Sequence, residues 1–164
     1  MFLPEIPTTL LNDTRKTTPL WRKLEKEAVR HGGGRNHRFG LADGILIKDN
    51  HIVAAGSISE SVRRARENSP HTLRVEIEVE EIDQLNEAIA AGADVVLLDN
   101  FTLEMLKEAV VAAKGRVLLE ASGGVNLQSV RAIAETGVDF VSCGALTHSA
   151  RAIDLTMEFS VTQG

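Results

Sequence analysis

The sequence has a single cysteine in 164 residues. A lone cysteine, Cys143, excludes an internal disulfide framework and fits a reducing compartment. Because it lies in an apolar segment with no base assigned to it, it is interpreted as small core filler. No apolar run approaches the length that a membrane-spanning helix needs, and the first residues lack the basic stretch of a signal peptide. These absences predict a soluble, cytoplasmic protein.

Positive charge is in deficit as well. The chain has 18 Lys and Arg against 23 Asp and Glu, which gives a formal net charge of -5. General attraction to nucleic acid or to an anionic membrane needs positive charge clustered over a surface, so neither partner is expected. Any phosphate that this protein binds must therefore be bound locally.

What the sequence does contain is a series of six short apolar runs, and a charged residue, a serine or a glycine closes or follows each one. The runs are rich in Val, Ile and Leu, which is typical of parallel strands covered on both faces. Ligands bind at the carboxyl edge of such sheets. The runs cover residues 9–13, 44–49, 74–79, 95–100, 117–122 and 140–144, and their polar ends are Asp13, Lys48, Glu78, Asp99, Ser122 and Gly144.

Segments between the runs have helical periodicity. Thr18 and Pro19 predict the start of the first helix, with Leu20, Leu24 and Ala28 on one apolar face before a stop at Gly32. Further helices are predicted from a capping box at Ser57 and Glu60, and before glycines that end the later ones. These later stop positions are Gly92, Gly115 and Gly137.

The predicted fold is α/β, in one domain with a substantial core, because 43% of the residues are hydrophobic and two full domains would not fit. Six strand–helix units are fewer than the eight of a closed barrel. Polar ends on all six strands favour an open or incomplete parallel α/β barrel of about six strands over a doubly wound sheet. The tail alternates Leu155, Met157 and Phe159 with polar residues, which predicts a strand that pairs outside this chain.

Cations are expected to converge at one mouth of this barrel. They follow the first two strands and a glycine-rich stretch, and their density suits a substrate with several carboxylates or phosphates. Any one of them alone is better interpreted as a solvated surface charge. The five residues are Arg15, Lys16, His37, Arg38 and Lys48.

Two carboxylates, Glu78 and Asp99, end neighbouring strands at the same mouth. Such a pair holds sugar hydroxyls, coordinates magnesium or stabilises a developing cation, although each alone simply neutralises a nearby lysine. Ser122, Gly123 and Gly124 offer backbone N–H groups at the next helix start, with Asn126 as its cap, which is a phosphate cradle in physical terms. The glycine after the sixth strand, Gly144, lets a second backbone segment approach the same anion.

The chain resembles the quinolinate phosphoribosyltransferase family in six ordered motifs, from about Asp13 to Phe159. They are residues 13–19 (DTRKTTP), 33–38 (GGRNHR), 46–51 (LIKDNH), 98–100 (LDN), 120–124 (EASGG) and 144–149 (GALTHS). The resemblance implies a type II phosphoribosyltransferase barrel and a homodimer that acts in de novo NAD biosynthesis. The implied reaction joins quinolinate to phosphoribosyl pyrophosphate with Mg2+, and yields nicotinate mononucleotide, pyrophosphate and carbon dioxide.

The resemblance also implies a role for each site residue. Arg15, His37, Arg38 and Lys48 would form the pocket for the quinolinate carboxylates, with Lys16 near the pyrophosphate. The catalytic residues would be Lys48, Glu78 and Asp99, of which Glu78 and Asp99 hold the ribose hydroxyls and the metal, directly or through water. The 5'-phosphate site would comprise Ser122, Gly123, Gly124 and Gly144, and His148 would lie close to the diphosphate.

One departure from the family concerns its N-terminal domain. We expect residues 1–12 to be a short lead-in in place of that domain, and residues 13–164 to be the catalytic barrel. In the family dimer the N-terminal domain covers the partner's active site and adds an arginine, so activity of this chain is expected to be impaired.

The residues alone leave other functions open. One is a different phosphosugar barrel enzyme, with Lys48 as a Schiff-base nucleophile. Another is a non-catalytic barrel that binds phosphate or a partner chain. A third is a related phosphoribosyltransferase that uses another aromatic acid.

Overall fold

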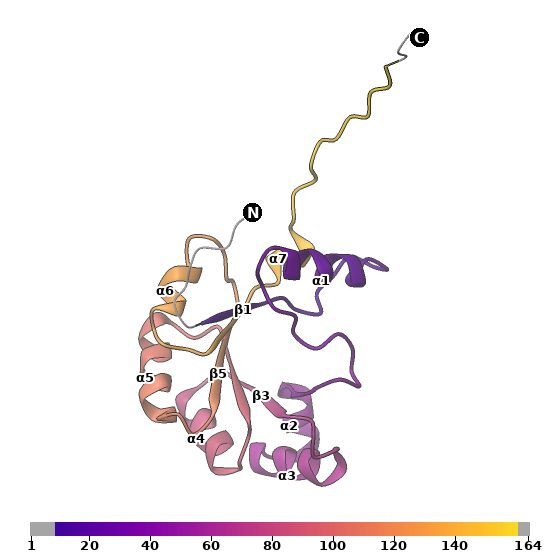
Figure 1. The fold of residues 1–164 in the computed structure, drawn as a ribbon. Coiled ribbons are helices and arrows are strands. Elements are labelled where there is room, and N and C mark those ends of the chain that lie inside the picture. The colour runs from indigo at the N-terminus through magenta and orange to yellow at the C-terminus, as the bar shows by residue number, and fades with distance from the viewer. Residues whose placement is uncertain (1–8, 161–164) are drawn as a thin grey trace.

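The computed structural model describes residues 9–160, so residues 1–8 of the expected lead-in lie outside the described part. Strands alternate with helices along the chain, as the sequence predicts (Figure 1). The strands are β1 (Leu10–Asn12), β2 (Ile45–Ile47), β3 (Val75–Val79), β4 (Val95–Asp99), β5 (Leu118–Ser122) and β6 (Phe140–Ser142). The six strands form a single sheet in which every pairing is parallel.

The order of the sheet is β1-β6-β5-β4-β3-β2, which leaves β1 and β2 at its two edges. A closed barrel would pair these two strands, but no ladder joins them anywhere between residues 9 and 160. On its outer side β1 instead makes a parallel bridge from Asn12 to Arg35. The structure is therefore the open parallel α/β barrel that the sequence predicts, with its gap between β1 and β2.

The helices cover the outside of this sheet, and α1 packs against α7 at one end of the molecule (Figure 1). None of the helices within the described range is long and apolar enough to cross a membrane. The helices are α1 (Arg22–His31), α2 (Asp49–Ala55), α3 (Ile58–Asn68), α4 (Ile82–Ala90), α5 (Leu103–Ala113), α6 (Val130–Ala134) and α7 (Ala145–His148).

The core lies between the strands and these outer helices. Val96 and Leu98 of β4 are fully buried and share a hydrophobic cluster with Leu85 of α4 and Leu106 of α5. Because side chains alternate along a strand, the residues between them point to the other face, into the barrel. That inner face of β3 and β5 carries carboxylates, so the apolar core and the polar interior are separated by the sheet itself.

The predicted start of the first helix is wrong. α1 begins at Arg22, three residues after Pro19, and Leu20 has a φ of 69°. The predicted apolar face is also wrong, because Leu20 and Leu24 are exposed whereas Lys26 and Val29 are buried. The physical reason is that Lys26 reaches inward to a buried carboxylate, Asp13, and this contact sets which face of the helix turns to the body.

The other helices follow the prediction more closely. The Ser57 side chain accepts a hydrogen bond from the Glu60 amide at 3.1 Å and caps α3. The later helices end before Gly92, Gly115 and Gly137, but α6 is reduced to five residues. The short helices α2 and α7 were not predicted from the sequence.

Within the described residues the tail forms no strand, and its predicted pairing outside this chain stays a prediction. Residues 151–160 contain no helix or strand, and they run away from the body of the molecule (Figure 1). Leu155, Met157 and Phe159 are exposed. Alternating sequence favours a strand only where a neighbouring strand completes its backbone hydrogen bonds, and the described residues supply no such neighbour.

Candidate active site

The carboxyl ends of the central strands bring the predicted polar residues to one edge. Asp99 of β4 is in register with Ser122 of β5. Lys48, the residue after β2, forms an ion pair with Glu78 of β3. The two predicted catalytic strand ends, Lys48 and Glu78, are therefore in direct contact, and Asp99 follows on the next strand of the sheet.

The loop after β5 approaches the loop after β4 very closely. Gly123 has a φ of 99°, and a Cβ atom there would lie 2.2 Å from Asn100 Oδ1 and 2.9 Å from Asn100 N. Gly124 follows with a φ of 58°. Asn126 Oδ1 accepts hydrogen bonds from the amides of Gln128 and Ser129 at 2.9 and 3.1 Å, so it caps the turn at residues 127–129. The prediction that it caps the next helix is wrong, because α6 begins later, at Val130, with Ser129 as its N-cap. Only glycine at position 123 permits this packing, and it leaves backbone uncovered by side chains at the edge.

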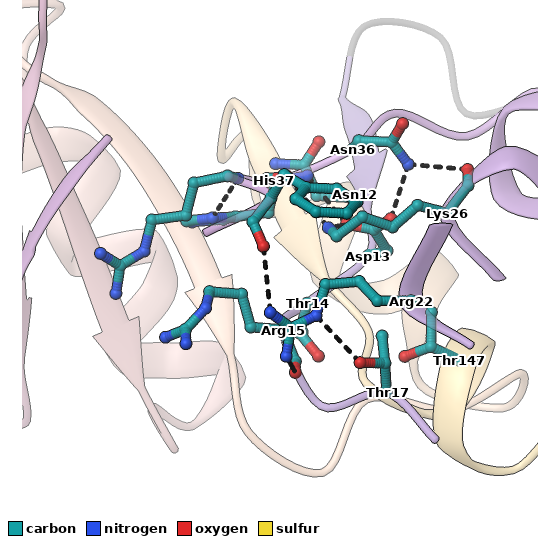
Figure 2. Close-up of polar contacts among 12 residues, drawn as sticks. Asn12, Asp13, Thr14, Arg15, Thr17, Arg22, Lys26, Asn36, His37 and Thr147 are labelled. Carbon is teal, nitrogen blue, oxygen red and sulfur yellow. Dashed lines mark hydrogen bonds and ion pairs between the residues drawn. The ribbon is translucent and has the colours of Figure 1, made fainter. Parts of the chain in front are cut away.

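A second glycine loop closes the other side of the same edge. A Cβ atom on Gly144 would lie 2.9 Å from His148 Nε2 and 3.5 Å from Thr14 Oγ1. The Thr147 hydroxyl donates to the backbone carbonyl of Lys16 at 2.6 Å, and Thr14 and Thr147 lie in the same region of Figure 2. The turn after β6 therefore brings His148 and the Lys16 backbone, both predicted site residues, into one neighbourhood.

Two arginines lie close together next to the gap in the barrel. Arg15 and Arg38 are half-buried, and each has a buried Nε with no hydrogen-bond partner among residues 9–160. Burial, followed by the positive charge of Arg15, lowers the pKa of Arg38. Two guanidinium groups with unsatisfied donors form a setting that a ligand with several anionic oxygens completes.

A buried ion pair holds the loop that carries Arg38. Lys26 Nζ lies 2.5 Å from Asp13 Oδ1, and both side chains are almost fully buried. The Asn36 side chain donates to Asp13 at 2.6 Å, and the His37 amide donates to it at 2.9 Å (Figure 2). Asp13 ends a strand, as the sequence indicated, but its contacts fix the loop rather than face the mouth.

His37 is oriented differently from the prediction. Its imidazole enters the barrel interior, where Nε2 lies 3.1 Å from Glu76 Oε2 and 3.6 Å from Glu120 Oε1. Its Nδ1 accepts a hydrogen bond from the Arg38 amide at 2.8 Å. The ring therefore contacts protein carboxylates, while the neighbouring Arg38 guanidinium remains next to Arg15.

Glu76 and Glu120 are site residues that the sequence reasoning missed. The signal was present, because Glu76 and Glu78 alternate along β3, and Glu120 and Ser122 alternate along β5. In a barrel both members of each pair face inward, the earlier one deeper. Burial, together with the negative charge of Glu76, raises the pKa of Glu120 to about 7.

The ligand atoms of His37, Glu76 and Glu120 lie within 4.8 Å of one another, a spacing that a metal ion spans. The contacts favour a hydrogen-bonded cluster instead. Asn12 and Ser142 both donate to the Glu120 carboxylate, and His37 bonds to Glu76. Oxygen ligands for a hard cation are offered separately by Glu78 and Asp99 at the edge.

Comparison with known proteins gives the same result as the motifs. Residues 5–158 match the family described as quinolinate phosphoribosyl transferase, C-terminal domain. A Bacillus subtilis relative, named probable nicotinate-nucleotide pyrophosphorylase (carboxylating), is 50% identical over 150 residues, which cover 92% of this chain and 52% of the relative. A Mycobacterium leprae relative, named nicotinate-nucleotide pyrophosphorylase (carboxylating), is 46% identical over 151 residues. These residues cover 90% of this chain and 53% of the relative.

A solved structure leads to the same family. The nicotinate-nucleotide pyrophosphorylase from Francisella tularensis is 53% identical, with a TM-score of 0.87 over 90% of this chain and 52% of that chain. This chain thus spans about half the length of the relatives that it matches. By sequence and by fold, the chain belongs to the quinolinate phosphoribosyltransferase family and matches its C-terminal domain.

Proposed function

We propose that this chain is the barrel of a carboxylating nicotinate-nucleotide pyrophosphorylase of NAD biosynthesis. It transfers the phosphoribosyl group of phosphoribosyl pyrophosphate to quinolinate, and releases pyrophosphate and carbon dioxide. Membership of the family and the names of the relatives support the proposal. The observation that carries it is the edge at the carboxyl ends of β2 to β5, where Lys48 contacts Glu78 and where Asp99 is in register with Ser122.

Quinolinate recognition is assigned to the arginine pair. Quinolinate has two adjacent carboxylates, and planar guanidinium groups bind carboxylates with paired hydrogen bonds. Arg15 and Arg38 offer buried donors that no described residue satisfies. Lys48 adds a third cation, and its contact with Glu78 fixes its position.

Phosphoribosyl binding is assigned to the rest of the edge. Gly123, Gly124 and Gly144 give the 5'-phosphate access to backbone, and Glu78 with Asp99 takes the ribose hydroxyls. As pyrophosphate leaves, positive charge develops on the sugar, and these carboxylates stabilise it. Lys16 and His148 lie on the side of the leaving pyrophosphate.

Magnesium is proposed as the cofactor, and the donor set fits it because Glu78 and Asp99 present carboxylate oxygens on adjacent strands. When bound, the ion would offset charge on the leaving pyrophosphate. Lys48 already neutralises part of the charge on Glu78, which favours contact of the ion with Asp99 or through water.

A cytoplasmic homodimer is also proposed. Exposed apolar side chains on and before α1, namely Leu20, Trp21 and Leu24, support burial against another copy. Light scattering tests this, with a mass of twice the 17.8 kDa chain as the expected result.

The Schiff-base alternative is less well supported. Lys48 is held in an ion pair with Glu78, and an ammonium group in an ion pair is not nucleophilic. No second observation favours that chemistry.

Turnover tests the proposed function directly. The chain is incubated with quinolinate, phosphoribosyl pyrophosphate and magnesium, and nicotinate mononucleotide is measured against a Lys48→Ala control. We expect product above the control. Binding of both substrates without product would indicate a binding module, and failure to bind either would contradict the proposal.

A further inference from the structure

We propose that Glu76 and Glu120 are positioning residues for the quinolinate site, because through His37 they hold Arg38 in place. His37, Glu76 and Glu120 form a cluster that shares one proton, and this proton sets the net charge next to Arg38. This inference rests on the proposed function. Neither carboxylate lies at the strand ends where the substrate is expected. Their effect therefore passes through the side chains that they contact.

The contacts define a relay from the two carboxylates to Arg38. His37 Nδ1 accepts the Arg38 amide hydrogen at 2.8 Å, so the ring proton lies on Nε2. Nε2 in turn points at Glu76 at 3.1 Å and at Glu120 at 3.6 Å. The imidazole thus bridges the backbone of Arg38 and the inner face of β3 and β5. Removal of the acceptor on Glu76 would free the ring, and the Arg38 amide would lose its partner.

The two carboxylates are buried too deeply to be ordinary surface charges. Glu76 is 7% exposed and Glu120 is 3% exposed. Asn12 Nδ2 donates to Glu120 at 3.2 Å, and the Ser142 hydroxyl also donates to it, whereas Glu76 Oε1 is buried with no partner among the described residues. Two adjacent buried carboxylates cannot both be ionised without a large cost, so one proton is retained between them.

Four other charged groups surround the cluster. The cluster borders an open cavity of about 610 Å³, which is lined largely by residues at the amino ends of β2, β3, β4 and β6. The other titratable groups that line it are Lys26, Arg38, Asp43 and Arg74. Lys26 is paired with Asp13, and beyond Arg38 lies the charge of Arg15. The protonation of the cluster therefore acts most directly on the Arg38 site.

The location of the shared proton follows from the hydrogen bonds. Burial and Glu76 raise the pKa of Glu120 to about 7. Burial disfavours the imidazolium, but the hydrogen bond to Glu76 and the charges of Glu120 and Glu76 outweigh it and raise the pKa of His37. Both effects describe one proton in a coupled group. Because Nδ1 already accepts the Arg38 amide, the proton is placed on Glu120.

A dependence of quinolinate binding on pH follows. Below about pH 7 Glu120 is mostly protonated, and the cluster then carries a single negative charge. As the pH rises through about 7, a second negative charge appears below the arginines and opposes the incoming dianion. Quinolinate should therefore bind more weakly at alkaline pH.

The experiment compares four variants of the full chain. Glu120→Gln keeps the shape of the neutral acid, Glu76→Gln keeps an acceptor for His37, and Glu76→Ala removes it. Glu135→Gln makes the same charge change at an exposed position of the outer surface and serves as the matched control. Calorimetry measures the Kd of quinolinate at about pH 6 and about pH 8, and nitrogen NMR of the imidazoles, assigned with His37→Gln, reports the tautomer of His37 without ligand.

We expect the Kd of the unmodified chain and of Glu135→Gln to rise about tenfold between the two pH values, and that of Glu120→Gln to change less than about twofold. Glu76→Ala should lose the single tautomer, and Glu76→Gln should retain it. If Glu76→Ala fails to fold, the pH dependence of the Kd in Glu120→Gln and Glu76→Gln tests the inference instead. An unchanged pH dependence in Glu120→Gln, or an unchanged tautomer in Glu76→Ala, would overturn the inference. If the unmodified chain binds no quinolinate at either pH, the proposed function fails, and the tautomer measurement alone decides whether the carboxylates position His37.

Discussion

At the scale of single residues, the cations of the site are held by other protein groups. Lys48 contacts Glu78, and Arg38 donates to the Gly44 carbonyl at 3.2 Å. For Arg15 it is the backbone that is held, because Arg22 donates to its carbonyl at 3.1 Å. Long charged side chains lose conformational freedom when they bind a ligand, and fixing them beforehand reduces that loss. This restriction supports the proposed binding of an anionic substrate.

The buried pair of Asp13 and Lys26 is expected to be essential for stability. Lys26→Ala would leave the Asp13 carboxylate buried, with only the Asn36 amide and the His37 N–H as donors. Breaking such a pair costs about 3 to 5 kcal/mol. Urea unfolding of the variant measures this loss, and a decrease in unfolding free energy below about 1 kcal/mol would contradict the assignment.

Glu120 should make the chain less stable as the pH rises. Its pKa is about 7 in the folded chain and 4.5 ordinarily, so the unfolded state releases the proton first. Stability is thus lost as the pH rises from 4.5 to about 7, and the loss is constant above that, at most about 3 kcal/mol. The raised pKa of His37 reports the same shared proton and has the same sign. Urea unfolding at about pH 5 and about pH 8 should show that Glu120→Gln gains stability relative to the unmodified chain at the higher pH, and parallel behaviour of both proteins would count against it.

At the scale of elements, the glycine loops set how closely the strand ends approach. Gly123→Ala would place its Cβ atom against Asn100, in addition to the strain of a φ of 99°. We expect a loss of about 1 to 3 kcal/mol in stability and weaker binding of phosphoribosyl pyrophosphate, with quinolinate binding preserved.

Gly56→Ala is the matched control for this loop. Gly56 ends α2 with the same φ of 99°, and nothing lies within 4 Å of an added Cβ atom. Gly56→Ala therefore introduces the same backbone strain as Gly123→Ala, but without a close contact such as that with Asn100. Equal effects of the two substitutions on phosphoribosyl pyrophosphate binding would show that the loop after β5 has no special part in it.

The elements differ in how far the sequence could predict them. Ser57 caps α3 through a local contact with the Glu60 amide, and contacts between residues this near in sequence can be predicted from the sequence. The start of α1 depends on the contact between Lys26 and Asp13, which lies 13 residues away in the sequence. The local cap signal at Thr18 therefore predicted the wrong helix start. The tail alternated correctly for a strand but lacks a neighbour within residues 9–160.

At the scale of the whole molecule, the parallel order of the sheet places the polar strand ends together. Once the strands were recognised as parallel, their polar ends had to share one edge, and Lys48, Glu78, Asp99 and Ser122 do so. The interior carboxylates were harder to predict, because their burial depends on the curvature of the sheet. The open edge between β1 and β2 then leaves room for the loop that carries His37 and Arg38.

The central claim is that a pyridine with two adjacent carboxylates binds between Arg15 and Arg38. Calorimetry of the chain with quinolinate and with nicotinate, which lacks the second carboxylate, tests it most directly. We expect quinolinate to bind at least about tenfold more tightly, and Arg38→Ala to abolish the difference while Glu135→Gln preserves it. Equal affinity for the two acids, or a preference that survives Arg38→Ala, would contradict the account.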